Sequence, residues 1–317
     1  MFLLLAMNYS ITRRDFFRAS GLAIASFGLL PNPIAAIEPF SRSAPPRLRL
    51  SLAAYSFRDY FKDANHKRES DRASVKQLDM FQFVDYCAEH GCQGAEVTSY
   101  YFPEKITNDY LIKLKRHAFL RGVEISGTAV GNDFIYPPGK ERDEQIASVK
   151  TWIDRAFVLG APHIRVFAGS AKNASKVEAK TLCLSAIEEC ADYAGGKGIF
   201  LGLENHGGIV AEADDLLAIV RAVKSPWLGI NLDTGNFHTD DPYNDIAKCA
   251  PYAVNVQLKG EVQKRGAKQE PADLKRLVTI LHEANYQGYV ALEYESAEDP
   301  WKAVPGLLKR LKALFEE

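Results

Sequence analysis

The chain has 317 residues, of which 47% are hydrophobic and 25% carry a charged side chain, a composition typical of a globular protein with a buried core. Its formal net charge is −1, which argues against nucleic-acid binding because a phosphate backbone requires a basic surface. The five cysteines match neither a zinc motif nor a compact disulfide framework, so we expect them to be buried as small hydrophobic residues.

Residues 1–36 have the pattern of an export signal. The segment Thr12-Arg13-Arg14-Asp15-Phe16-Phe17 precedes a short apolar run that ends before Pro31. Paired arginines ahead of such a run resemble a twin-arginine signal peptide, which predicts export of the folded protein to the periplasm or beyond. The run is shorter than the roughly 20 residues that span a bilayer, so we expect no stable membrane insertion after cleavage. An amphipathic helix and an uncleaved anchor are the alternatives.

Residues 37–47 contain three prolines and are predicted to be a linker. Residues 48–317 are predicted to form one domain in which β-rich and amphipathic segments alternate eight times. The expected strands are Arg49–Tyr55, Gly94–Thr98, Val123–Thr128, His163–Phe167, Ile199–Glu204, Leu228–Asp233, Ala253–Leu258 and Tyr289–Glu293. The expected helices are Val75–His90, Asp109–Arg121, Arg142–Leu159, Val177–Ala194, Ala213–Val223, Asp241–Ala250, Pro271–Ala284 and Trp301–Phe315. Eight such units predict a parallel (β/α)8 barrel, a TIM barrel. The rival, an open doubly wound sheet, lacks its glycine-rich phosphate loop here.

Polar residues end four consecutive strands on the side that the two-residue period points into the barrel. They are Glu204, Asp233, Gln257 and Glu293. Active sites of this fold lie at the carboxyl ends of the strands, so we expect these side chains to converge there. Three converging carboxylates repel one another, and either lysines and arginines or a divalent cation must compensate. We favour one divalent ion with all four residues as ligands.

These strand ends carry segments that resemble a known family. Leu203-Glu204-Asn205-His206-Gly207, Leu232-Asp233-Thr234-Gly235-Asn236, Val256-Gln257-Leu258-Lys259-Gly260 and Leu292-Glu293-Tyr294 are similar to segments of the sugar isomerases and epimerases with a xylose-isomerase-like barrel. That family includes ketose 3-epimerases, inosose dehydratase and hydroxypyruvate isomerase. Two residues depart from its pattern, because Gln257 stands where a histidine is usual and Gly260 where an aspartate is usual.

The departure at Gln257 bears on the identity of the ion. With a glutamine oxygen in place of a histidine nitrogen the ligand set is all oxygen, which favours Mn²⁺, with Mg²⁺ and other hard divalent ions as alternatives, over zinc. Gln257 could instead bond the substrate and leave three protein ligands.

The resemblance implies that Glu204 and Glu293 are both metal ligands and the pair that transfers a proton. A metal-bound carbonyl acidifies the neighbouring C–H group, and the enediolate that forms can be reprotonated to give an isomer or an epimer. We expect substrate contacts from inward or nearby polar residues, with a salt bridge or a structural role as the alternative for most of them. These candidates are His206, Arg165, Lys259, Glu96 and His238.

The sequence therefore predicts a divalent-metal-dependent isomerase or epimerase of a sugar-like ketose, with a small carbohydrate as its partner and, by resemblance, a homodimeric state. The first alternative is a lyase that eliminates from a 3-keto sugar or cyclitol through the same intermediate. The second is a sugar-binding barrel without catalysis. A nuclease related to apurinic endonucleases requires many histidines at the strand ends, and the chain has only seven.

Overall fold

The computed structural model describes residues 37–63, 76–170 and 174–317. They belong to the compact unit Ala36–Glu317. The expected signal peptide, residues 1–36, lies outside the described residues. Within the described ranges, no helix combines the length and the apolar character needed to cross a membrane.

Eight strands form a closed barrel, as the sequence predicts. Around the barrel their order is β1-β10-β7-β6-β5-β4-β3-β2, and every pairing is parallel. The strands are β1 (Arg47–Ala53), β2 (Gly94–Thr98), β3 (Glu124–Ala129), β4 (His163–Val166), β5 (Phe200–Glu204), β6 (Leu228–Asp233), β7 (Ala253–Leu258) and β10 (Gln287–Leu292). Because all eight run in one direction, their carboxyl ends open on one face of the barrel, which we call the mouth.

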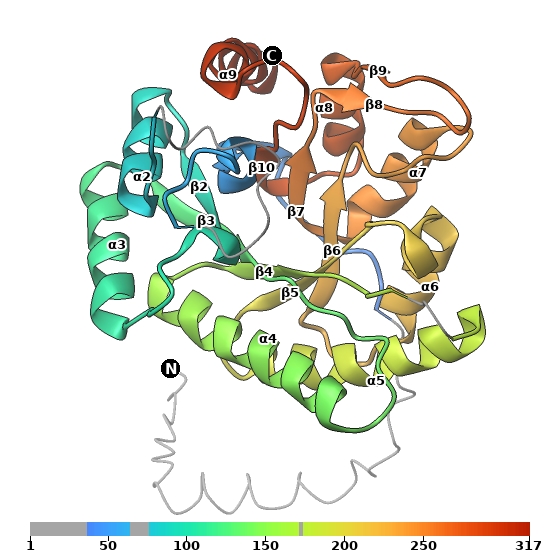
Figure 1. The fold of residues 1–317 in the computed structure, drawn as a ribbon. Helices are drawn as coiled ribbons and strands as arrows, with labels where there is room; N and C mark the ends of the chain where they lie inside the picture. The colour runs from blue at the N-terminus through green and yellow to red at the C-terminus, as the bar shows by residue number, and fades with distance from the viewer. Residues whose placement is uncertain (1–36, 64–75, 171–173) are drawn as a thin grey trace, which may run out of the picture. The chain divides into compact units, whose positions relative to one another are not determined.

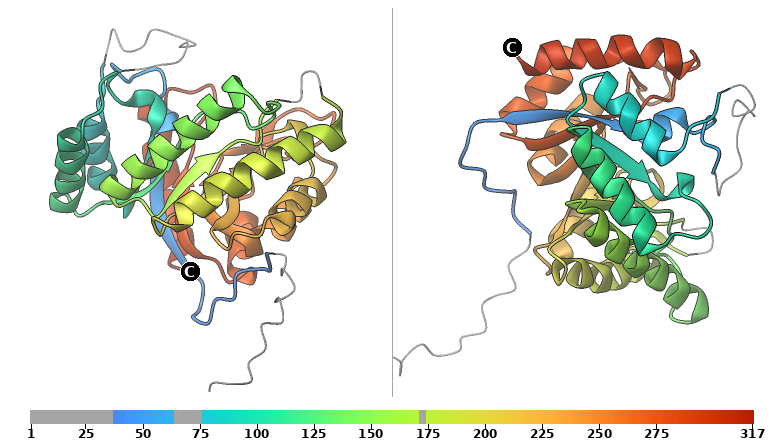
Figure 2. Two further views of the ribbon diagram at one scale, coloured as in Figure 1. Left: turned by 90° about the horizontal axis from the view of Figure 1, so that it is seen from below. Right: turned by 90° about the vertical axis from the view of Figure 1, so that its left-hand side faces the viewer.

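Helices follow the strands and surround the barrel on its outside (Figures 1 and 2). They are α2 (Met80–Glu89), α3 (Asn108–Leu120), α4 (Lys140–Leu159), α5 (Lys176–Gly195), α6 (Ala213–Ala222), α7 (Pro242–Cys249), α8 (Leu274–Glu283) and α9 (Pro300–Phe315). Short 3-10 helices accompany them in the described residues, namely η1 (Ala54–Phe57), η3 (Ser99–Tyr101), η4 (Gly208–Val210) and η5 (Ala250–Tyr252).

Two helices begin three or more residues later than the sequence predicts, each for a visible reason. The first was expected from residue 75, but Asp79 caps α2 in a capping box with Gln82, and the helix begins at Met80. The second, α8, is predicted to begin at Pro271. That proline instead pairs with Glu261 in a small antiparallel ribbon of β8 (Glu261–Val262) and β9 (Glu270–Pro271), and Asp273 caps α8.

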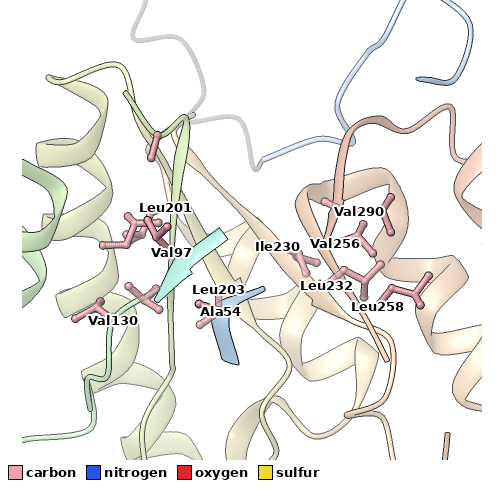
Figure 3. Close-up of a cluster of buried hydrophobic side chains, with 14 of the residues drawn as sticks. Ala54, Val97, Val130, Leu201, Leu203, Ile230, Leu232, Val256, Leu258 and Val290 are labelled. Carbon is pink, nitrogen blue, oxygen red and sulfur yellow. The ribbon is translucent and has the colours of Figure 1, made fainter. Parts of the chain in front are cut away.

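The core lies between the outside of the barrel and the helices. Figure 3 shows aliphatic side chains of several strands in this layer, all of them fully buried, namely Leu201, Leu203, Ile230, Leu232, Val256, Leu258 and Val290. Each such side chain contributes roughly 1.5–3 kcal/mol through burial. All five cysteines are free and buried, as expected. Since the aliphatic positions of these strands face the helices, the alternate positions face the barrel axis and carry the polar residues.

Candidate active site

Two acidic residues that the sequence places at the mouth converge on one lysine. Lys259 follows β7, and its Nζ lies 3.2 Å from Oδ2 of Asp233 at the end of β6. The same Nζ lies 3.6 Å from Oε1 of Glu293, which follows β10, and it also contacts Oε2 of Glu295. The predicted convergence of strand ends is therefore present, but its centre is an ammonium group.

Glu204, at the end of β5, has a different cation. Oε2 of Glu204 lies 2.9 Å from Nε of Arg165, a buried ion pair whose N–H is not aligned as a hydrogen bond. Its Oε1 lies 3.0 Å from Nδ1 of His206 and accepts a hydrogen bond from Nδ2 of Asn236 at 3.0 Å. Burial raises the pKa of Glu204, but Arg165 and then His206 outweigh it, and the net pKa is lowered. Glu204 is thus held as a carboxylate at neutral pH.

Two of the carboxyl groups beside Lys259, those of Asp233 and Glu293, are more easily protonated than Glu204. Burial raises the pKa of Asp233 to about 6, with the attraction of Lys259 opposing the shift. Burial also raises the pKa of Glu293 well above its ordinary value, again against Lys259. For Lys259 burial lowers the pKa, but Asp233, Glu293 and Glu295 together outweigh it, so the ammonium form persists. The mouth therefore holds one firmly ionised glutamate and one that favours its protonated form.

Below the mouth, four polar side chains form a hydrogen-bonded layer inside the barrel, which we call the barrel floor. Nε2 of Gln257 donates to Oε1 of Glu96 at 2.6 Å, and Oε1 of Gln257 accepts from Nδ2 of Asn231 at 2.6 Å. Nδ2 of Asn255 contacts Oε2 of Glu96 at 2.7 Å and Oδ1 of Asn231 at 2.8 Å. The predicted substrate contact of Glu96 does not match this position, because its side chain is fully buried and both its oxygens are occupied.

The divalent ion expected from the sequence does not fit this arrangement. Both amide atoms of Gln257 are engaged in the floor, Glu204 is paired with Arg165, and Lys259 lies against Asp233 and Glu293. In the part of the chain that the structure describes, no three histidine, cysteine, aspartate or glutamate side chains are grouped so as to hold a metal. In this arrangement Arg165 and Lys259 place positive charge against the carboxylates, and the four-ligand set stays a prediction.

The remaining predicted contacts divide into two kinds. The side chain of His206 is 57% exposed, and it lines a cavity of about 310 Å³ together with Phe167 and Asn132, beside Glu204. Arg165 lies over the ring of Phe167, 4.0 Å from its centroid, and so connects that cavity to the carboxylate. His238 is exposed on the loop after β6. His206 is therefore placed to contact a molecule at the mouth, whereas Arg165 is buried and paired with Glu204.

Two residues at the mouth were not among the predicted site residues. Asn236 donates to Glu204, and its Oδ1 lies 3.3 Å from Nζ of Lys259, so it bridges the two charged groups. Glu295 is the third carboxylate on Lys259. Both could have been found from the sequence. Asn236 is the last residue of the segment that contains Asp233, and Glu295 lies two residues after Glu293, so the two-residue period directs it to the same side.

Comparisons with known proteins agree with this fold. A family model described as xylose isomerase-like TIM barrel matches residues 84–311. A search of curated protein sequences gives no match.

Three similar solved structures illustrate the fold. The 3-keto-D-glucoside 4-epimerase from E. coli in its apo form is 15% identical with a TM-score of 0.62, covering 84% of this chain and 100% of its own. D-psicose 3-epimerase with D-tagatose from Clostridium cellulolyticum H10 is 15% identical with a TM-score of 0.64, covering 84% and 97%. A xylose isomerase-like TIM barrel protein from Mycobacterium smegmatis in complex with magnesium is 17% identical with a TM-score of 0.64, covering 86% and 96%. These identities show likeness of fold.

Proposed function

Because the chain belongs to the xylose isomerase-like TIM barrel family, we propose that it is an isomerase or epimerase that moves a proton next to the carbonyl group of a sugar-like ketose. The similar structures named as epimerases of 3-keto-D-glucoside and D-psicose support a small carbohydrate as its ligand. One observation carries the proposal. Glu204 and Glu293 reach the mouth from strands three places apart around the barrel, and each has its own cation.

This pair can perform the two halves of a proton transfer. Glu204, held as a carboxylate by Arg165, removes the proton from the carbon beside the carbonyl group. The electron pair of that C–H bond forms a double bond to the carbonyl carbon, and the π pair of the C=O bond moves to the oxygen. The carboxyl group of Glu293 then returns a proton from another side of the substrate. Return to the opposite face of the same carbon inverts it and gives an epimer. Return to the adjacent, former carbonyl carbon gives an isomer when the hydroxyl proton of the first carbon also passes to the former carbonyl oxygen.

Substrate binding is assigned to the groups that line the rest of the mouth. The imidazole of His206 and the ring of Phe167 border the cavity beside Glu204 and offer a hydrogen bond and an apolar surface. Proton abstraction is most efficient when the reacting atoms are held about 3–3.5 Å apart. A sugar placed over Glu204 with one end in this cavity would meet that requirement.

Solvent isotope exchange tests the proposal directly. The full-length protein is incubated in D2O with a panel of ketoses and 3-keto sugars, and deuterium at the carbon beside the carbonyl group is followed by NMR. Glu204→Gln and Glu293→Gln are each expected to slow exchange by about 10²–10⁴-fold, the usual contribution of a general acid or base. Glu141→Gln, at an exposed position of α4, is the matched control and should exchange at the wild-type rate. Exchange at the wild-type rate in both site variants would reject the assignment.

The cavity beside His206 favours a lyase as the second candidate. With about 310 Å³ it has room for a leaving group attached to the substrate. An enediolate with such a group on the neighbouring carbon eliminates it instead of taking up a proton. Release of an alcohol or of water in the same assay would identify the lyase, and binding of sugars without exchange or release would identify a sugar-binding barrel.

We further propose, from the twin-arginine pattern at residues 1–36, that the protein acts outside the cytoplasm. Cell fractionation of the wild type and of an Arg13→Lys, Arg14→Lys variant tests this, since the variant should remain in the cytoplasm. The homodimer implied by the family resemblance is tested by light scattering of the purified protein.

A further inference from the structure

The ammonium group of Lys259 occupies the centre at which the sequence predicts a divalent ion. Resting on the proposed function, we infer that Lys259 supplies the positive charge for the negatively charged oxygen of the enediolate and that the enzyme works without a bound metal. The proposal assigns to Lys259 a catalytic role, and it assigns to Asp233 and Glu295 the role of holding that lysine in place.

The position of Lys259 between carboxylates is the first argument. Its Nζ lies 3.2 Å from Asp233 and 3.6 Å from Glu293 and also contacts Glu295, and its side chain is only 13% exposed. A doubly charged ion bound by Asp233 and Glu293 would have to lie within a few ångströms of this ammonium group. Like charges at such a distance repel strongly in a partly buried site, so the lysine and the ion exclude each other.

The second argument is that the local backbone is shaped to hold this lysine. A Cβ atom on Gly235 would lie 2.7 Å from Cδ and 2.9 Å from Cβ of Lys259, so only glycine leaves room for the stem of the side chain. The backbone N–H of Lys259 donates to Oγ1 of Thr234 at 3.0 Å, and the N–H of Thr234 donates to the carbonyl oxygen of Gln257 at 2.9 Å. These contacts direct the lysine from the end of β7 across the end of β6.

The third argument comes from the donor atoms that an ion would need. Gln257, which takes the place of the usual histidine, uses its oxygen and its nitrogen in the barrel floor. Glu204 directs Oε2 to Arg165 and Oε1 to Asn236 and His206. Breaking either set of bonds leaves buried polar groups without partners, which is unfavourable. Two of the four expected ligands are thus already committed to protein partners.

The chemistry of the step requires charge and does not require a metal. When Glu204 removes the proton, one negative charge develops on the former carbonyl oxygen, and an ammonium N–H directed at that oxygen stabilises it. Lys259 remains protonated throughout, so the proton balance involves only the substrate, Glu204 and Glu293. Electrostatic stabilisation of this kind is strongest where water is largely excluded, as it is around Lys259.

The first test measures Mn²⁺ binding to the purified full-length protein by the loss of its free-ion EPR signal, together with metal analysis of the protein as isolated. The wild type is expected to contain no stoichiometric divalent metal and to leave equimolar Mn²⁺ free. Lys259→Met removes the competing charge from three carboxylates and should bind Mn²⁺ at least tenfold more tightly than the wild type. Lys248→Met, which removes a surface lysine that contacts Asp214, should behave as the wild type.

Stoichiometric Mn²⁺ in the wild type would overturn the inference, and this measurement stands even if Lys259→Met fails to fold. A folded Lys259→Met protein that binds no more Mn²⁺ than the wild type would also count against it, because the ammonium would then not occupy the place of an ion.

The second test separates this inference from the proposed function. Exchange by the wild type should continue in EDTA, and Lys259→Met should lower kcat by at least 100-fold with a smaller effect on KM, with partial recovery in Lys259→Arg. Exchange that stops in EDTA and returns with Mn²⁺ would retain the proposed function and reject the role of Lys259. An absence of exchange with every sugar, with and without Mn²⁺, would reject the proposed function. The catalytic role of Lys259 would fall with it, because that role rests on the proposed function. The Mn²⁺ titration would still report whether the site holds an ion.

Discussion

Two buried groups in the barrel should make opposite contributions to the pH dependence of stability. Oε2 of Glu96 and Nε2 of His163 lie 3.9 Å apart, and both side chains are almost completely buried. Burial raises the pKa of Glu96 to about 7, against the hydrogen bond from Gln257 and the attraction of Arg165. Burial lowers the pKa of His163 to about 4, with a hydrogen bond to the backbone of Ser126 opposing. Both groups are therefore uncharged in the folded protein near pH 5.5.

The signs follow from comparing the folded and unfolded states. Between pH 4.5 and 6.5 the folded state keeps a proton on Glu96 that the unfolded state has lost, so the contribution of Glu96 to stability falls as the pH rises. Over the same range the unfolded state carries a proton on His163 that the folded state lacks, so the contribution of His163 rises. At about 1.36 kcal/mol per pH unit for a full proton difference, which is reached only in the middle of the interval, each contribution changes by about 2 kcal/mol, and in the wild type the two cancel.

Single substitutions should reveal the two contributions, measured as free energies of unfolding in urea at a series of pH values. Glu96→Gln is expected to gain about 2 kcal/mol relative to the wild type as the pH rises from 4.5 to 6.5, and His163→Gln to lose about as much. When the free energy of unfolding of each variant is compared with that of the wild type at the same pH, the contributions of all other titrating groups cancel. Difference curves that are flat with pH for both variants would refute the reasoning, and slopes of the same sign would refute the assignment of opposite shifts.

Two further substitutions test the close packing of Gly127 against His163 and the buried ion pair of Arg165 with Glu204. Gly127→Ala would place a methyl carbon 1.9 Å from Cε1 of His163, and we expect a loss of about 3 kcal/mol in urea unfolding, whereas Gly306→Ala, with no atom within 4 Å of its added carbon, should lose none. Arg165→Met leaves Glu204 buried without its main cation, and we expect a loss of about 3–5 kcal/mol at pH 8 that becomes smaller at pH 5, where the carboxyl group takes up a proton. A loss independent of pH would show that Arg165 acts through packing alone.

The fold was predictable from the sequence because it depends on local periodicity. Eight alternations of strand and helix can bury their apolar faces in a closed barrel, and the two-residue period within a strand determines which side chains face the axis. Leu232 faces the helices and Asp233 the mouth, as this period requires. The ribbon of β8 and β9 was not predicted, because its two-residue strands carry no periodic signal.

The partners within the site were less predictable than its members. The sequence places Glu204, Asp233 and Glu293 at one mouth, but the choice between an ion and a lysine at their centre depends on side-chain directions. A lysine stem is flexible, and its direction here is determined by contacts with Gly235 and Asn236 on the neighbouring strand end. These contacts join residues that follow two different strands and are more than twenty positions apart in the sequence. They therefore produce no periodic pattern that a sequence analysis could detect.

The departure from the family pattern at Gln257 is physically connected, through β7, to the lysine at the mouth. Asn255, Gln257 and Lys259 lie on its inward face, so the residue that completes the barrel floor is only one inward position below the residue that occupies the mouth. A histidine in place of Gln257 would have to accept from Asn231 and donate to Glu96 with a rigid ring, whereas the amide satisfies both in one plane. Gln257 is engaged in the barrel floor in this way, and the next inward residue, Lys259, is the one that places its ammonium group against Asp233 and Glu293.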